Sequence, residues 1–355
     1  MPEEIVASTD DLQDGQMTEV KVGDRNVLLA RVGEEFFALA PECPHAGGQL
    51  AQGTLCEGHL RCPWHQARFD ARTGDLEEPV SLDGLPRFDV RVEDGDVIVS
   101  VPDEPAEKRS MPMTDFDPEA DDRTFLIVGA GASAAGAAEA LRQDGYQGRI
   151  VMITREQQIP YDRTKLSKGY LKIPGADSYP PVLRSEDFYE ENGIELITGR
   201  EVTKLDAESQ VVELDDDSHM DYDAALLATG GRPRTLPIPG MDLENVFLLR
   251  SVADADAIRA ALEDAMYGVV VGASFIGMEA AAGLTGRDVQ VTVVAPESVP
   301  FELSLGQEVG GVVQRLHEDK DVLFEMGRTV ASFEGDDVVE DVVLDNGDRV
   351  EADLV

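Results

Sequence analysis

The stretches "ECPHAGGQL" (residues 42–50) and "LRCPWHQARF" (residues 60–69) each carry one cysteine and one histidine almost side by side. Cys43 and His45 form a Cys-x-His pair, and Cys62 and His65 form a Cys-x-x-His pair. Thiolates suit iron, and imidazoles suit iron or zinc, so two such loops can hold one metal ion or one cluster between them. A zinc site is the first alternative, but its ligands usually come as a cysteine pair followed by a histidine pair. The mixed halves favour an asymmetric cluster, with both cysteines on one iron and both histidines on another.

The sequence around the two loops indicates β-strands. Short apolar or alternating stretches are broken by glycine and aspartate, and none has a long helical period. They are "RNVLLARV", "EEFFALA", "HLRCPW" and "RFDVRVEDGDVIVSV". This pattern therefore predicts an all-β domain over residues 1–101. Cys56 and His59 lie between the two loops, and we interpret them as ordinary strand or turn positions.

Taken together, these residues resemble the Rieske-type [2Fe–2S] ferredoxin domain. The resemblance implies that Cys43 and Cys62 bind one iron and that His45 and His65 bind the other. Gln66 stands where this family usually has a glycine, so we expect the second loop to bend differently from the usual loop of the family. Zinc, or four residues placed in turns by chance, remain the alternatives.

The pattern changes after residue 101. A Pro-rich, charged stretch, "PDEPAEKRSMPMTDFDPEADDR" (residues 102–123), predicts an inter-domain linker. An apolar strand, a glycine-rich turn, an Ala-rich helix and a second strand follow in "TFLIVGAGASAAGAAEALRQDG" and "GRIVMI", and the same order recurs in "YGVVVGASFIGMEAAAGLTGRDVQVTVVA". Two Rossmann-like α/β nucleotide-binding domains are therefore predicted, over residues 124–240 and 241–355.

The first glycine-rich turn carries Gly129, Gly131 and Ala134 in the places of G-x-G-x-x-G/A. Such a turn lets backbone amides approach a pyrophosphate at the N-terminus of the helix. The next strand ends near Glu156, which is our candidate for the ribose hydroxyls. An Ala-rich helix start without a ligand is the alternative.

Two further motifs, "IPYDRTKLSKGYL" (residues 159–171) and "LLATGGRP" (residues 226–233), complete a second resemblance. From about residue 124 onward the chain is similar to apoptosis-inducing-factor-like proteins and oxygenase-coupled ferredoxin reductases, which are FAD enzymes. The resemblance implies that Arg163 and Lys168 contact FAD, with Lys168 near the reactive edge of the flavin. It also places Thr229 and Gly230 in a cofactor-binding turn. No Cys-x-x-Cys follows the first helix, so disulfide-reductase chemistry is excluded.

The second glycine-rich turn has Gly272, Ser274 and Gly277 in the motif positions, with Glu279 just after them. A carboxylate in a first helical turn is commonly a partner of the helix dipole. The resemblance implies more, because it places Glu279 at the junction of nicotinamide and flavin, where it can pair with Lys168. We therefore expect Lys168 and Glu279 to be the catalytic residues.

The strand after this second turn ends in Ala295-Pro296-Glu297. The acid that usually binds the ribose would fall at Ala295, and Glu297 is its candidate substitute. No arginine stands immediately there to accept a 2′-phosphate, so the sequence favours NADH over NADPH.

Acidic residues outnumber basic ones by 71 to 30, which gives a net charge of −41. A negative charge spread along the whole chain argues against nucleic acid and anionic membranes as partners. It suits a halophilic protein, because high salt screens the repulsion between like charges. We find no secretory signal and no apolar run of the roughly 18 residues that a membrane helix needs. Because two of the three cysteines are assigned to the cluster, we expect a reducing, cytoplasmic location.

These features predict an NAD(P)H-dependent FAD oxidoreductase that passes electrons to its own Rieske cluster and then to an unidentified acceptor. The first alternative is a non-catalytic Rieske electron carrier or redox-sensing module. The second is an interaction protein whose nucleotide binding governs association. The flavoprotein resemblance also implies a closing segment and a third α/β domain after "NGDRVEADLV" (residues 346–355), with contacts to the flavin that residues 1–355 do not supply.

Overall fold

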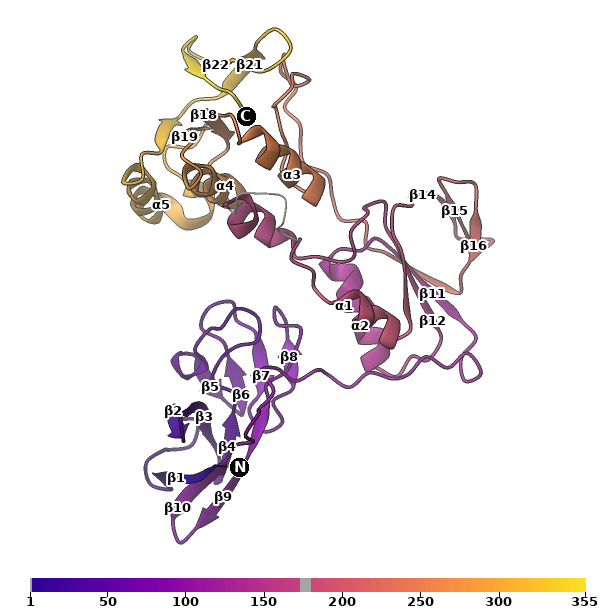
Figure 1. Cartoon of the computed structure of the whole chain (residues 1–355), viewed down its shortest axis with the longest axis vertical. Helices are drawn as coiled ribbons and strands as arrows, with labels where there is room; N and C mark the ends of the chain where they lie inside the picture. Colours follow the sequence, from indigo (N-terminus) through magenta and orange to yellow (C-terminus); the bar gives the residue numbers. More distant parts are fainter. Residues whose placement is uncertain (1, 173–179) are drawn as a thin grey trace. The chain divides into compact units, whose positions relative to one another are not determined.

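The computed structural model describes residues 2–172 and 180–355 (Figure 1). The chain divides into two compact units. The first comprises Met1–Thr114 with Leu141–Tyr146, and the second comprises Asp115–Ala140 with Gln147–Val355.

The first unit contains the predicted all-β domain, built on two antiparallel sheets. The larger sheet has the strand order β1-β10-β9-β4-β3-β2. Its strands are β1 (Glu3–Ser8), β2 (Met17–Val22), β3 (Arg25–Val32), β4 (Glu35–Leu39), β9 (Arg87–Glu93) and β10 (Asp96–Ser100). Apolar side chains from β3, β4 and β10 are buried at its centre, as their sequence pattern predicts.

The smaller sheet carries the two Cys/His loops. Its order is β5-β6-β7-β8. The strands are β5 (Thr54–Cys56), β6 (His59–Arg61), β7 (Arg68–Asp70) and β8 (Leu76–Glu78), and the short helix η1 (Leu50–Gln52) precedes them. The first Cys/His loop leads into η1, and the second joins β6 to β7.

The segment over residues 102–123 is attached at both ends, although its composition predicts a linker. Arg109 exchanges two backbone hydrogen bonds with Gly84, at 2.8 and 3.1 Å, and its side chain pairs with Asp75. Near the other end, the Asp117 amide donates to the Gln147 carbonyl at 2.9 Å. Only the middle of the segment is left to act as a connection.

The first nucleotide-binding fold has a parallel sheet in the order β13-β12-β11-β17. Its elements are β11 (Thr124–Val128), α1 (Ala132–Gln143), β12 (Arg149–Ile153), η2 (Arg163–Lys165), the π-helix η3 (Leu166–Tyr170), α2 (Glu186–Glu191), β13 (Ile194–Ile197) and β17 (Ala224–Leu227). An antiparallel sheet of β14 (Val202–Asp206), β15 (Val211–Leu214) and β16 (His219–Asp221) follows β13.

The second nucleotide-binding fold repeats the plan with a parallel sheet in the order β18-β19-β20. Its elements are α3 (Val252–Ala261), β18 (Tyr267–Val271), α4 (Phe275–Thr285), β19 (Gln290–Ala295), α5 (Glu302–Glu318), β20 (Leu323–Met326), and the antiparallel strands β21 (Val330–Glu334), β22 (Asp341–Leu344) and β23 (Arg349–Glu351). No helix within the described ranges is both long enough and apolar enough to cross a membrane.

Glycine is required where strand and helix meet in both folds. Gly129 has φ of +122°, and a Cβ atom there would lie 2.2 Å from the Ala228 carbonyl oxygen. A Cβ atom on Gly277 would lie 2.0 Å from the Gly272 carbonyl oxygen. Any side chain at Gly129 or Gly277 would therefore push these turns apart, which explains both motifs in steric terms.

Candidate functional site

The two Cys/His loops share one backbone hydrogen-bond pattern. In each loop the cysteine amide donates to the carbonyl five residues later, at 2.9 Å. The amide four residues after each cysteine donates back to the cysteine carbonyl, at 2.9 Å after Cys43 and 3.2 Å after Cys62. The loops therefore share one turn, in which the two cysteines occupy equivalent positions and the histidines stand two and three residues after them.

Gln66 adopts the bend that its position in the second loop requires. Its φ is +66°, against +74° for the equivalent Gly47 of the first loop. The bend is kept, and a glutamine takes a left-handed conformation that favours glycine.

The four predicted ligands converge as two pairs. Cys43 and Cys62 are each 2 % exposed, and both belong to the same hydrophobic cluster. The rings of His45 and His65 pack edge to face with their centroids 4.7 Å apart. His65 is exposed and His45 is partly buried, so the sulfur pair lies inside and the imidazole pair lies towards solvent.

This donor set fits a two-iron cluster. Burial, together with the neighbouring Cys62, raises the pKa of the Cys43 thiol to about 11. A thiolate at this buried point needs a cation beside it, which iron would supply. A Cβ atom on Gly48 would lie 3.1 Å from the Cys62 sulfur, so the backbone closes tightly over this ligand.

The zinc alternative differs from the cluster in the number of protein ligands that each metal ion takes. Structural zinc is usually held by four protein ligands, whereas each iron of the cluster predicted here needs two. The arrangement therefore favours the two-iron cluster over the zinc alternative.

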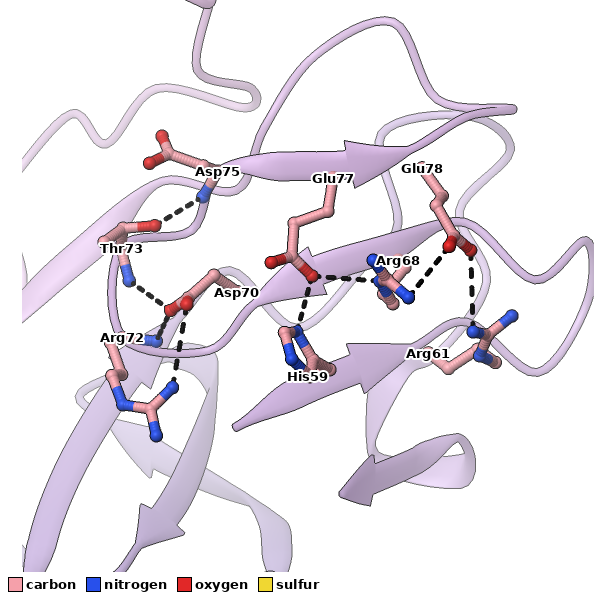
Figure 2. Close-up of polar contacts among 9 residues, drawn as sticks. All are labelled: His59, Arg61, Arg68, Asp70, Arg72, Thr73, Asp75, Glu77 and Glu78. Atoms are coloured by element: carbon pink, nitrogen blue, oxygen red, sulfur yellow. Dashed lines mark hydrogen bonds and ion pairs between the residues drawn. The ribbon is translucent and has the colours of Figure 1, made fainter. Parts of the chain in front are cut away.

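Cys56 and His59 belong to the polar outer side of the small sheet, as predicted. Cys56 ends β5 and His59 begins β6, and the two pair across a tight turn. Figure 2 shows that His59 points to Glu77, with 2.6 Å between Nδ1 and Oε2, and that Arg68 bridges Glu77 and Glu78. These are strand-to-strand contacts of the scaffold.

The first glycine-rich turn brings two predicted segments together. Ala134 is fully buried in α1, which explains why a small residue stands in the third motif position. The Ala228 amide donates to the Val128 carbonyl at 2.9 Å, so the turn at Thr229 and Gly230 lies beside the end of β11. The cofactor-binding roles assigned to Gly129, Gly131, Ala134, Thr229 and Gly230 remain predictions.

Glu156 and Arg163, both predicted to bind FAD, are partners of each other. Their side chains form an ion pair, and Arg163 also contacts the Tyr161 hydroxyl. The Tyr161 hydroxyl donates to Glu156 Oε2 at 2.6 Å. Burial and the hydrogen bond to Glu156 raise the pKa of Tyr161. A ribose reaching Glu156 would join this hydrogen-bonded group, and that role stays a prediction.

Lys168 and Glu279 meet, as the sequence predicts. Lys168 Nζ lies 3.6 Å from Glu279 Oε1, and the Ser167 hydroxyl donates to Glu279 Oε2 at 2.6 Å. Ser167 is buried, whereas the Lys168 and Glu279 side chains are 48 % and 30 % exposed. The Lys168 side chain therefore remains accessible to a ligand, while the buried Ser167 hydroxyl holds the Glu279 carboxylate.

The second glycine-rich turn borders a large apolar cavity. This cavity has a volume of about 610 Å³, and Gly272, Ser274 and Gly277 line it together with apolar side chains. Ser274 is the N-cap of α4, but its side chain makes no capping hydrogen bond. A cavity of this size is within the range for small-molecule sites, so it can receive part of a dinucleotide.

Ser167 and Tyr161 are the site residues that sequence reasoning missed. Both lie inside the quoted motif "IPYDRTKLSKGYL", directly beside predicted residues. Serine and tyrosine are not charged side chains, so neither stands out as a candidate site residue in a loop sequence. Their contacts with Glu279 and Glu156 span 112 and 5 residues, respectively, and appear only in the folded chain.

Family models match almost the whole chain. Residues 3–89 match the Rieske [2Fe–2S] domain, and residues 123–355 match the pyridine nucleotide-disulphide oxidoreductase family. Apoptosis-inducing factor 3 of Homo sapiens is 38 % identical over 361 residues, which covers 99 % of this chain and 58 % of that protein.

Reductases of oxygenase systems match the second unit. The ferredoxin reductase component of chlorobenzene dioxygenase from Cupriavidus sp. is 37 % identical over 64 % of this chain and 55 % of its own length. Among solved structures, the putidaredoxin reductase–putidaredoxin complex superposes with a TM-score of 0.62 at 32 % identity, over 66 % of this chain and 57 % of that chain. The chain thus spans less than three fifths of the length of these relatives.

The family matches agree with the loops and turns described above. Residues 123–355, which match this family, contain no cysteine. They therefore lack the redox-active disulphide to which the family's name refers. The chain belongs to the pyridine nucleotide-disulphide oxidoreductase family and carries a Rieske [2Fe–2S] domain ahead of it.

Proposed function

We propose that this protein is an NAD(P)H-dependent FAD oxidoreductase that delivers electrons to its own Rieske cluster and then to a separate acceptor. The observation that supports this most strongly is one chain holding both converging Cys/His loops and two nucleotide folds joined at the Lys168–Glu279 contact. The family matches to the two units agree with it.

The chemistry explains why these parts belong together. Nicotinamide gives up two electrons as a hydride, whereas a [2Fe–2S] cluster accepts one electron at a time. FAD, when bound, supplies the conversion between the two. The protein's own task is to bind both cofactors, orient them and exclude competing reactions.

Lys168 and Glu279 are the residues we assign to the junction of the two cofactors. The Ser167 hydroxyl and the Lys168 ammonium group hold opposite oxygens of the Glu279 carboxylate, at 2.6 and 3.6 Å. This arrangement fixes the carboxylate and places one positive charge beside it. Such preorganised charges favour a reaction in which charge moves between bound groups.

The Rieske loops are the proposed outlet for electrons. His65 and Trp64 are exposed, so an acceptor can approach the imidazole pair more closely than the buried sulfur pair. Relatives of the second unit are named as components of dioxygenase systems, and we propose a one-electron acceptor protein as the partner. We place the protein in the cytoplasm, because the two cysteines assigned to the cluster leave Cys56 without a disulfide partner in this sequence.

An anaerobic titration with NADH and NADPH tests the proposal. The protein, reconstituted with FAD, iron and sulfide, is expected to show flavin and cluster absorption bands, and both should bleach when a nicotinamide is added. In Glu279→Gln we expect the bleaching rate to fall by about 10²-fold, because the charge at the junction is removed. Glu308→Gln, an exposed acid on α5, is the matched control and should bleach at the wild-type rate.

Two results separate the alternatives. Cys62→Ser should lose the cluster bands and keep flavin bleaching, because the flavin lies upstream of the cluster. Cluster bands with no retained FAD would instead support a Rieske carrier. Flavin and cluster bands that neither nicotinamide bleaches would contradict the enzyme.

A further inference from the structure

The end of β19 lacks the acid that usually selects NADH. In dinucleotide-binding folds, a carboxylate at the end of the second strand accepts hydrogen bonds from the ribose 2′-hydroxyl, and NADP sites use a nearby arginine instead. Here β19 ends at Ala295, whose methyl side chain is 1 % exposed. The acid is thus missing from its usual position, and the nearest carboxylate that follows along the chain is that of Glu297, two residues further on.

The fold brings an arginine to the same point from a distant part of the sequence. Strand β20 runs parallel to β19, with Met326 opposite Ala295, so both strands end at the same edge. The chain then turns at Gly327, which has φ of +71°. Gly327 donates to the Glu297 carbonyl at 2.8 Å, and Arg328 donates its amide to the Ala295 carbonyl at 3.1 Å.

The Arg328 side chain is available to a ligand. It is partly exposed, and it makes no hydrogen bond or ion pair with any residue in the described ranges. Of the acids nearby, Glu302 is occupied, since its carboxylate accepts hydrogen bonds from Ser298 and Gln307 at 2.6 to 2.9 Å. In so acidic a chain, an arginine without an acidic partner at a nucleotide edge indicates an anion.

We propose that Ala295 and Arg328 form a subsite for the 2′-phosphate of NADPH. The inference rests on the nicotinamide site of the proposed function and specifies NADPH as the dinucleotide that this site prefers. Arg328 neutralises the phosphate and donates hydrogen bonds to it, while Ala295 adds no negative charge that would repel it. The sequence around residue 295 alone favours NADH, because Arg328 lies 33 positions further along the chain.

Binding of two adenosine probes to the full-length protein tests the subsite without relying on turnover. Calorimetry with 2′,5′-ADP and with 5′-AMP, in the same KCl concentration, isolates the contribution of the 2′-phosphate. We expect 2′,5′-ADP to bind at least about tenfold more tightly than 5′-AMP. Arg328→Ala should abolish this difference and leave the affinity for 5′-AMP unchanged.

A matched control separates a local effect from loss of positive charge. Arg315 is exposed in the last turn of α5, a helix that begins near the end of β19. It lies in the last turn of α5, beyond the kink at Gly306, so Arg315→Ala should keep the preference for 2′,5′-ADP. In Glu297→Gln, a weaker affinity for 5′-AMP would mean that Glu297 serves as the ribose acid and would count against the subsite.

The outcomes distinguish this inference from the proposed function. Equal binding of the two probes, or a preference that survives in Arg328→Ala, would overturn the subsite while the nicotinamide site stands. Failure of both probes to bind would overturn the nicotinamide site and the subsite together.

Discussion

At the scale of single residues, the second Rieske loop shows how the fold enforces a bend on an unsuitable side chain. Gln66 occupies the left-handed region at φ +66°, where Gly47 sits in the first loop. The hydrogen bonds of the two loops nevertheless match. The ligand geometry is therefore set by the loop pattern, and Gln66 bears the strain.

Replacing Gln66 with glycine should stabilise the first unit. The left-handed conformation costs a non-glycine residue about 1–2 kcal/mol, and the greater freedom of glycine in the unfolded chain offsets about 0.4–1 kcal/mol of that. We expect the unfolding midpoint of this unit to rise by about 4 °C in Gln66→Gly, followed by circular dichroism. Gln66→Ala keeps the strain and should show no rise; an equal rise in both variants would refute the explanation.

Residue types point to candidate metal ligands but give little signal for the supporting contacts. The four cluster ligands stand out because cysteine and histidine are rare in this chain and recur in matching pairs. Ser167 and Tyr161 carry no such signal. Their roles depend on Glu279 and Glu156, which the tertiary fold places beside them.

At the scale of elements, a buried ion pair ties α1 to the segment that leads into α2. Arg184 and Glu139 form two hydrogen bonds, at 2.9 and 3.2 Å, and both side chains are 6 % exposed. Their charges compensate each other in a place that water cannot reach. Tyr189 lies near them, and its pKa is raised by burial and by Glu139.

Breaking this pair from one side should destabilise the second unit strongly. Arg184→Met leaves the Glu139 carboxylate buried without its partner, which costs about 3–5 kcal/mol. We expect the unfolding midpoint of this unit to fall on the order of 10 °C, measured by calorimetry. The double variant Glu139→Leu/Arg184→Met should recover most of the loss; a double variant as unstable as the single one would show that packing, and not charge, is responsible.

The regular elements of the nucleotide folds are predictable for a local reason. Strand, glycine turn and helix each carry their own pattern, and steric limits at Gly129 and Gly277 make those patterns strict. The π-helix η3 has no such local pattern. The position of Arg328 beside Ala295 likewise follows from parallel pairing of β19 and β20, which no single stretch of sequence reveals.

At the scale of the whole molecule, the dominant feature is the large negative net charge. The net charge of −41 is carried by a chain of 355 residues, and most ion pairs within the described ranges are exposed. Exposed pairs contribute little, so they do not offset the general repulsion. Salt shortens the range of that repulsion, from about 10 Å at 0.1 M to about 3 Å at 1 M.

We predict that KCl stabilises the protein. The thermal midpoints of both units should rise steeply between 0.1 and about 1 M KCl and more slowly above that, because screening is then nearly complete. Sucrose is the control, since it strengthens burial of surface without screening charge. Midpoints that stay constant over this range would refute the halophilic interpretation.

The central claim is that two mixed sulfur–nitrogen loops hold two irons that nicotinamide reduces through FAD. Mössbauer spectroscopy of protein reconstituted with ⁵⁷Fe, sulfide and FAD tests it most directly, before and after anaerobic addition of NADH or NADPH. The account predicts two distinct irons in equal amounts, with the added electron on the histidine-bound iron, because its neutral ligands leave it less negative. A single type of iron, or a spectrum that neither NADH nor NADPH changes, would contradict the account.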